Sequence, residues 1–348
     1  MSINKLKALV DSGREGKNVG LQIGLPKLES KIDGLTASTY YLIGGGTSSG
    51  KTSLLLYSFI YKPFMNKGTR KVHFIYYSLE MPEEILQAKL ISIYIYEKYN
   101  KILTVKDILS KNRGTLLSDE NYEIICKAYT WLEELDSCLT IYDKGLTANK
   151  LYAHLSTELE KYGKIIETDN KKTYIPDDNS QLISVMIDHI GLIRATEGRK
   201  KKEEIDLASS YLVTLKNRCG ISPIVLSQIN RQSSSMDRRN ANFQEIELQD
   251  FKDTGNPAED ADNVIAIYNP FREKVATYKG YDIKILQHRF RGILILKNRY
   301  GETDISVGTL FYGEIGSFKE LPKASEINDY EKYITPPEVE KLNTEIIN

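Results

Sequence analysis

The feature that most constrains the fold of this chain is a glycine-rich segment between an apolar run and a helical pattern. Its residues fit the pattern G-x-x-x-x-G-K-[ST]: Gly45, Gly46, Thr47, Ser48, Ser49, Gly50, Lys51 and Thr52. Glycines let the backbone curl so that its N–H groups point at phosphate oxygens, and the following helix adds partial positive charge. Lys51 would reach the β- and γ-phosphates of ATP, and the Thr52 hydroxyl would bind Mg²⁺. A plain glycine-rich turn is the weaker alternative, because motif and context are both present.

Short apolar runs alternate with helical patterns from Thr39 onward. The runs are rich in β-branched and aromatic residues, which is typical of strands covered on both faces. They span residues 40–43, 72–79, 139–142, 183–187, 223–227, 264–268 and 293–296. The alternation predicts an α/β fold with a mostly parallel central sheet flanked by helices.

Composition excludes several classes of protein. The chain has 348 residues, enough for one large α/β domain or two small ones. Lys plus Arg equals Asp plus Glu at 47 each, so any DNA binding must come from local basic loops. Three widely spaced cysteines without a CxxC pair support neither a disulfide framework nor a zinc site. No leader or apolar run of ~18 residues is present, so we expect a reducing, cytoplasmic setting and no membrane partner.

Two acidic residues follow predicted strands. Glu80 comes directly after the strand 72–79, and Asp188 follows the strand 183–187 as in a Walker B motif. Ligands bind at the carboxyl edge of the strands in open α/β sheets, so Asp188 would hold Mg²⁺ together with Thr52. His189 stands where many ATPases carry a catalytic glutamate, which favours Glu80 as the base that activates water. Position alone would favour a solvated helix-end charge for Glu80.

Two later strands also end in polar residues. Gln228 follows the strand 223–227 and could sense the γ-phosphate, although a turn or capping role fits equally well. Lys297 and Arg299 are two residues apart at the end of the last run, which puts them on one side of the strand. Such cations could neutralise charge on a transferred phosphoryl group, an effect worth ~10³–10⁵ in rate for an arginine finger. Spacing alone favours ordinary surface cations.

Two basic segments, 194–204 and 231–255, follow strands on the same edge of the predicted sheet. Basic side chains and exposed backbone N–H groups can follow a phosphate backbone without reading bases. The second segment contains Arg231, Arg238, Arg239, Lys252, Asp253 and Gly255. Because a run of charges is more often a solvated face, neither segment alone predicts DNA binding.

The ends of the chain suggest three regions. Residues 1–22 are predicted to form a linker helix and hinge, with Leu6, Leu9 and Val10 on one face that docks on its own domain or on a neighbouring subunit. Residues 23–318 are predicted to form the ATPase domain, interrupted at 164–180 by a polar insertion that forms a surface hairpin or loop. Residues 319–348 lose periodicity and are predicted to be a tail.

Taken together, the motifs resemble the C-terminal RecA-like motor domain of DnaB-type replicative helicases, a family of P-loop NTPases. The resemblance extends over roughly residues 24–318. The matching segments are GGTSSGKT, SLEM at 78–81, VMIDHIGLI around Asp188, LSQINR at 226–231, DFKDTGNPAEDAD at 250–262 and KNRYG at 297–301. SLEM and the lysine–x–arginine ending are much more specific than the phosphate loop.

The resemblance implies a role for each matching residue. Glu80 matches the glutamate that activates water, and Gln228 matches the sensor that couples hydrolysis to the DNA loops. Lys297 and Arg299 match cations that a neighbouring subunit inserts into the ATP site. The residues that match the family's contacts with single-stranded DNA are Lys252, Asp253 and Gly255.

The resemblance also implies an activity and an assembly. Helicases of this type are homo-hexamers with ATP sites at subunit interfaces, and they move 5′ to 3′ on single-stranded DNA. This sequence has no counterpart of the helical N-terminal domain that engages primase, so it resembles phage-encoded short forms and leaves primase or a helicase loader as open partners. The Asp188-His189 pair also replaces the usual Asp-Tyr.

Two alternatives remain at this level. One is a RecA-family DNA-dependent ATPase that does not unwind, such as a recombinase or a regulatory ring, and SLEM and KNRYG argue against it. The other is a non-catalytic scaffold of the same fold. Intact Lys51, Thr52, Glu80 and Asp188 argue against the scaffold.

Overall fold

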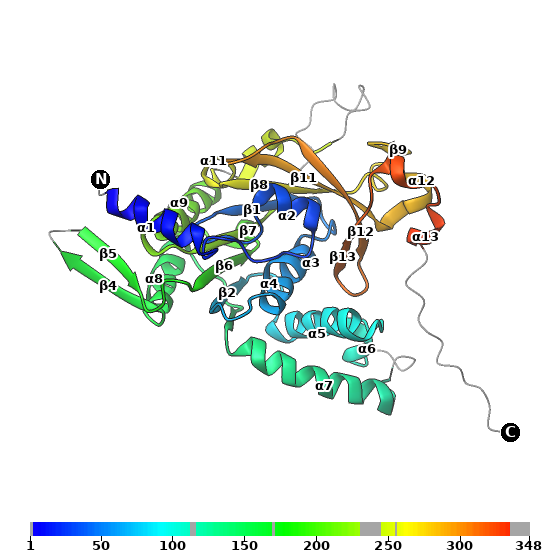
Figure 1. Cartoon of the computed structure of the whole chain (residues 1–348), viewed down its shortest axis with the longest axis horizontal. Helices are drawn as coiled ribbons and strands as arrows, with labels where there is room; N and C mark the ends of the chain where they lie inside the picture. Colours follow the sequence, from blue (N-terminus) through cyan, green and yellow to red (C-terminus); the bar gives the residue numbers. More distant parts are fainter. Residues whose placement is uncertain (1–2, 112–115, 169–170, 230–244, 255, 335–348) are drawn as a thin grey trace.

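The centre of the molecule is a large twisted sheet covered by helices (Figure 1). The computed structural model describes residues 3–111, 116–168, 171–229, 245–254 and 256–334. These residues form a nine-stranded sheet in the order β13-β12-β11-β8-β1-β7-β6-β2-β3. In that order the strands are β13 (Ser317–Glu320), β12 (Ile305–Tyr312), β11 (Phe290–Asn298), β8 (Asn263–Tyr268), β1 (Tyr41–Gly45), β7 (Ser222–Gln228), β6 (Leu182–Asp188), β2 (Val72–Ser78) and β3 (Leu139–Tyr142).

The strands from β8 to β3 pair in parallel, whereas β11, β12 and β13 add antiparallel pairs at one end. Each of the apolar runs in the sequence lies in one of the parallel strands or in β11, so the predicted mostly parallel sheet is confirmed. Two small strands, β9 (Thr277–Tyr278) and β10 (Tyr281–Asp282), form a separate pair.

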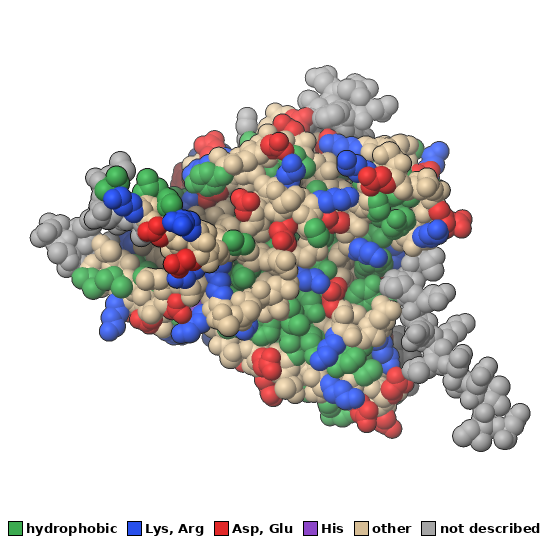
Figure 2. Space-filling view, viewed as in Figure 1, with side chains coloured by type: hydrophobic (Ala, Val, Ile, Leu, Met, Phe, Trp, Pro, Cys, Tyr) green, Lys and Arg blue, Asp and Glu red, His purple; other side chains and the backbone are tan. Residues whose placement is uncertain are grey.

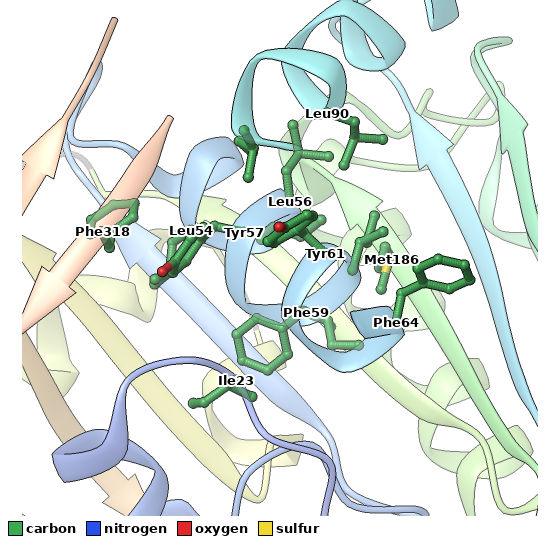
Figure 3. Close-up of a cluster of buried hydrophobic side chains, with 14 of the residues drawn as sticks. Ile23, Leu54, Leu56, Tyr57, Phe59, Tyr61, Phe64, Leu90, Met186 and Phe318 are labelled. Carbon is green, nitrogen blue, oxygen red and sulfur yellow. The ribbon is translucent and has the colours of Figure 1, made fainter. Parts of the chain in front are cut away.

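One face of the sheet is covered by the helix that follows the phosphate loop. It begins as α3 (Lys51–Leu54), continues through a π-helical stretch (Leu55–Tyr61) and ends as α4 (Lys62–Met65). Figure 3 shows its apolar side chains in a buried cluster that includes Ile23, Leu90 of α5 (Glu83–Tyr99) and Met186 of β6. The helix α7 (Asp119–Asp136) packs on α5, farther from the sheet (Figure 1).

The opposite face is covered by α8 (Ala148–Leu159) and α9 (Lys201–Cys219). Adjacent strand residues alternate between the two cores: Tyr41 and Ile43 face the first, and Tyr40 and Leu42 face the second. Each fully buried large apolar side chain contributes about 1.5–3 kcal/mol relative to leaving it exposed. The parallel strands are therefore held from both sides, and their carboxyl ends are fixed relative to one another.

The remaining elements are short. The helices are α2 (Pro26–Ile32), α6 (Val105–Ile108), α11 (Pro257–Asp260), α12 (Ile283–Leu286) and α13 (Glu331–Ile334). Short 3₁₀ segments span Ile190–Leu192, Leu248–Thr254, Gln287–Arg289 and Ala324–Glu326. No helix in the described ranges is long and apolar enough to cross a membrane.

The polar insertion forms an antiparallel hairpin of β4 (Gly163–Thr168) and β5 (Lys171–Pro176). It stands away from the sheet beside α8 (Figure 1). Tyr174 is buried and donates a hydrogen bond to the Leu159 carbonyl oxygen at 3.0 Å, whereas Ile166 and Ile175 are exposed. Of the two forms expected from sequence, a hairpin or a loop, the structure has the hairpin.

Both ends of the described chain bear on the predicted boundaries. The helix α1 (Ile3–Arg14) exposes Leu6, Leu9 and Val10, and hydrophobic side chains are visible over it in Figure 2. This stripe therefore does not dock on its own domain. At the other end, β13 continues to Glu320 and Leu321 is buried, so the chain stays packed past residue 318, where we expected the tail to begin.

Candidate nucleotide-binding site

The phosphate loop has the strand–loop–helix geometry that the sequence predicted. It leaves β1 at Gly45 and enters α3 at Lys51. Gly50 has φ of 104°, a left-handed conformation that residues with a Cβ rarely adopt. The Lys51 Nζ donates hydrogen bonds to the carbonyl oxygens of Gly45 at 3.1 Å and Gly46 at 3.0 Å. The lysine therefore lies over the loop, where a bound phosphate would meet it.

A cavity of about 380 Å³ opens above this loop. Loop residues 47–53 line it together with Glu80, Lys89, Asp188 and Gln228. The structure thus brings together side chains from the ends of β2, β6 and β7, which the sequence predicted, and one from α5, which it did not.

Asp188 ends β6 at the bottom of the cavity and is buried. It accepts a hydrogen bond from the Tyr76 hydroxyl at 2.9 Å. Burial raises the pKa of Asp188, and hydrogen bonds from Thr52 and Tyr76 act in the opposite direction. One carboxylate beside one hydroxyl suits Mg²⁺, which takes oxygen ligands and relies on substrate phosphates for others. Accordingly, the described residues contain no cluster of three or more His, Cys, Asp or Glu side chains that would form a complete metal cage.

Glu80 lies at the rim of the same cavity and is exposed. The turn that carries it is fixed from both sides. The Ser78 hydroxyl donates to the Met81 carbonyl oxygen, and the Leu79 N–H donates to the Asp188 carbonyl oxygen at 2.8 Å. An exposed carboxylate on a fixed turn beside the phosphate loop is in a suitable place to orient a water molecule.

Gln228 contacts the phosphate loop directly. Its Nε2 donates to the Thr47 hydroxyl at 3.0 Å, from the end of β7. Arg272, from the chain after β8, donates to the Thr47 carbonyl oxygen. Thr47 is therefore held by the last residue of β7 and by a residue after β8, the two strands next to β1.

Two cations at this site were missed from the sequence. Lys89 lines the cavity from the second turn of α5, and burial lowers its pKa, as it does that of Lys51, while nearby Asp188 acts in the opposite direction for both. The α5 helix buries residues around most of its circumference, so its pattern has no preferred face and no reason to single out Lys89. Arg272 lies in a segment without hydrophobic periodicity, so no sequence pattern indicated it as a residue of the site.

Lys297 and Arg299 lie at the opposite edge of the sheet. Because β11 is antiparallel to β8, Asn298 pairs with Asn263, which is also opposite Tyr41 at the start of β1. About 13 Å of strand, at ~3.3 Å per residue, separates that level from Gly45. The structure therefore does not bring either cation to the cavity of its own chain.

The predicted DNA contacts fall mostly outside the described residues, which applies to Arg231, Arg238, Arg239 and Gly255. Lys252 and Asp253 belong to the 3₁₀ turn Leu248–Thr254.

The other basic segment, 194–204, is partly structural. Arg199 forms an ion pair with buried Glu204 at 2.9 Å, and Lys201 donates to the Ile193 carbonyl oxygen.

Proteins of known function have sequences related to this chain. The replicative DNA helicase DnaB of Helicobacter pylori strain J99 is 22% identical over 357 residues, covering 93% of this chain and 65% of the relative. DnaB of strain 26695 is 23% identical over 341 residues, covering 89% of this chain and 61% of the relative. The chain thus spans less than two thirds of the length of these relatives.

Solved structures show the same fold. One solved ATPase domain superimposes with a TM-score of 0.69 and 21% identity, covering 92% of this chain and 99% of that one. A DnaB-like replicative helicase, solved in a study of its interactions with primase, gives a TM-score of 0.66 and 20% identity, covering 92% and 67%. The predicted RecA-like α/β fold is confirmed. The model of the DnaB-like helicase C-terminal domain family matches residues 20–320, and the chain belongs to that family.

Proposed function

We propose that this chain is the motor of an ATP-dependent replicative DNA helicase, which assembles as a homo-hexameric ring and moves 5′ to 3′ on single-stranded DNA. The observation that carries the proposal is the cavity in which the phosphate loop meets Glu80, Asp188 and Gln228. These are the groups that ATP hydrolysis requires, on a chain of a helicase family.

Each group has a distinct task in hydrolysis. Lys51 and the N–H groups of the loop bind the β- and γ-phosphates, and Thr52 and Asp188 would hold Mg²⁺. When bound, Mg²⁺ supplies positive charge to the phosphate oxygens. Glu80 orients the attacking water and takes its proton. Gln228, bonded to Thr47, follows the loop as the γ-phosphate is lost and passes the change into the chain beyond β7.

Two observations support completion of the site by a second copy of this chain. Lys297 and Arg299 lie at the sheet edge opposite their own phosphate loop, so they are available to a neighbour's nucleotide. The apolar stripe on α1 is exposed in the single chain and needs a surface to cover it. A closed ring of identical subunits satisfies both requirements, because each subunit presents one edge and receives the other.

DNA binding is proposed for the segment between β7 and α11. Its candidate contacts with the single-stranded backbone are Arg231, Arg238, Arg239, Lys252, Asp253 and Gly255. Backbone-directed cations of this kind would make binding independent of sequence and sensitive to salt. Primase is a candidate partner, because a structural neighbour was solved in a study of its interactions with primase. The proposed role in replication also implies that the protein acts in the cytoplasm.

The test combines two assays on the purified chain. We expect ATP hydrolysis that single-stranded DNA stimulates, unwinding of a forked duplex with a 5′ tail, and loss of both activities in Lys51→Ala. DNA-stimulated hydrolysis without unwinding would instead identify a RecA-family ATPase that is not a helicase. Negligible hydrolysis with or without DNA would identify a scaffold.

A further inference from the structure

We propose that Asp262 is a positioning residue for Arg299, which it holds at the sheet edge for the ATP site of the next subunit. The proposal rests on the function proposed above, because it assumes that Arg299 acts on a neighbour's nucleotide. It adds a residue that is remote from the phosphate loop of its own chain and that touches no nucleotide itself.

Asp262 connects α11 to β8 and is 1% exposed. Its Oδ1 lies 3.0 Å from Nη1 of Arg299. Its Oδ2 lies 2.6 Å from Nζ of Lys216 and accepts the N–H of Tyr40 at 2.8 Å. The Arg299 N–H also donates to the Asp262 carbonyl oxygen at 2.9 Å. One residue therefore accepts a hydrogen bond from the main chain of Arg299 and forms an ion pair with its guanidinium.

The two cations on this carboxylate are not equivalent. The Lys216 side chain is 7% exposed, whereas that of Arg299 is 45% exposed. Lys216, from α9, and the N–H before β1 thus anchor the carboxylate within the fold. Arg299 forms an ion pair with Asp262 through one nitrogen, and its partly exposed guanidinium has further N–H donors in a planar group suited to phosphate oxygens. One nitrogen of the guanidinium is paired with Asp262, and the remaining N–H groups are available to a ligand.

Lys297 is held by the same stretch of chain. Its Nζ donates to the carbonyl oxygens of Ala258 at 3.1 Å and Glu259 at 2.6 Å. Both cations therefore rest on residues 258–262, which follow closely on the 3₁₀ turn Leu248–Thr254. Fixing the cations before the nucleotide arrives lowers the reorganisation needed during the reaction.

The first measurement is the steady-state rate of Asp262→Asn rings with single-stranded DNA. We expect kcat to fall by about 10²-fold, as for a ~1 Å misplacement of a reacting group, while KM for ATP stays near its original value. Glu97→Gln is the matched control, because it also removes the charge of an acid that is paired with a lysine. Glu97 is half-buried, lies 2.5 Å from Lys62, and is away from the cavity and from Arg299. Equal loss in both variants would overturn the proposal.

The second measurement assigns Asp262 to one side of the shared site. Mixing Asp262→Asn with Glu80→Ala should restore turnover, because the first protein supplies Glu80 and the second supplies a well-held Arg299. Mixing Asp262→Asn with Arg299→Ala should restore nothing, because neither protein supplies a working cation. Recovery with Arg299→Ala, or none with Glu80→Ala, would contradict a positioning role.

The reference mixture of Arg299→Ala with Glu80→Ala tests the shared site itself. If mixed rings form but this pair shows no recovery, the proposed function fails at that point, and the role of Asp262 fails with it.

A second variant, Asp262→Glu, is used if the melting temperature of Asp262→Asn is well below that of Glu97→Gln. It keeps the negative charge for both cations and displaces Arg299 by about one methylene. We expect a smaller loss of kcat than in Asp262→Asn and the same results in the mixing experiments. If Asp262→Glu failed to restore turnover with Glu80→Ala but restored it with Arg299→Ala, the proposal would be overturned.

Discussion

Asp188 illustrates how a single residue can oppose folding and serve a reaction. Burial raises the pKa of Asp188 in the folded protein. Its ionised form therefore destabilises the fold at every pH above the pKa that Asp188 has in the unfolded chain, and this destabilisation disappears as the pH falls below that pKa. Asp188→Asn should therefore raise the melting temperature of the nucleotide-free protein near neutral pH and lower hydrolysis to background. Calorimetry and an ATPase assay check the two halves. A lower melting temperature would mean that the hydrogen bonds from Tyr76 and Thr52 depend on the charge.

Lys89 is one of the two cations at this site that no sequence pattern indicated. A second partly buried cation in the cavity should bind a phosphate oxygen, and hydrogen bonds to charged groups contribute about 1.5–3 kcal/mol. Lys89→Ala should raise KM for ATP roughly 10-fold to 100-fold on that basis. Lys98→Ala on the same helix is the control, because its Nζ contacts the Tyr94 hydroxyl at 2.6 Å outside the cavity. Equal KM values in the two variants would exclude a role for Lys89 in binding.

At the scale of the element, the strand–loop–helix unit depends on Gly50. A Cβ there would lie 3.2 Å from the rings of Phe311 and Phe318, and φ of 104° would remain strained. Gly50→Ala should therefore destabilise the domain by about 1–3 kcal/mol, measured by chemical denaturation. Gly46→Ala is the comparison for stability, since a Cβ at Gly46 meets nothing within 4 Å. Similar denaturation midpoints would show that the loop adapts to the added side chain.

Apart from β3, which lies at the edge of the sheet and is only partly buried, the strands predicted from sequence were those buried on both faces. These strands are continuous apolar runs, and the polar residue after each run marks the carboxyl edge, which is why Glu80, Asp188 and Gln228 could be picked out. The strand β12 was missed because Ser306, Gly308 and Thr309 interrupt its apolar pattern. Arg272 was missed because its place depends on how the chain after β8 folds back over Thr47, and local sequence does not encode that contact. The residues predicted to contact DNA stay predictions.

At the scale of the whole molecule, α1 should govern assembly. Leu6, Leu9 and Val10 are exposed in the single chain, so replacing all three with serine should leave the melting temperature of the monomer unchanged. Because the stripe is proposed to cover a neighbouring subunit, the same change should shift the protein from rings to monomers in analytical ultracentrifugation and lower ATP turnover with it. If the triple serine variant formed rings as stable as those of the original protein, the apolar stripe on α1 would have to contact a partner other than the neighbouring subunit.

The segment from Leu248 to Asp262 would affect the order in which the subunits of such a ring hydrolyse ATP. One end of it contains Lys252 and Asp253, and the other end contacts Arg299 and Lys297, which lie at the sheet edge opposite the phosphate loop of their own chain. A strand bound by one subunit would therefore act on the ATP site of the neighbouring subunit as well as on its own. Hydrolysis would then travel around the circle in a fixed sense, and the handedness of that travel would be set by which side of each subunit carries β11.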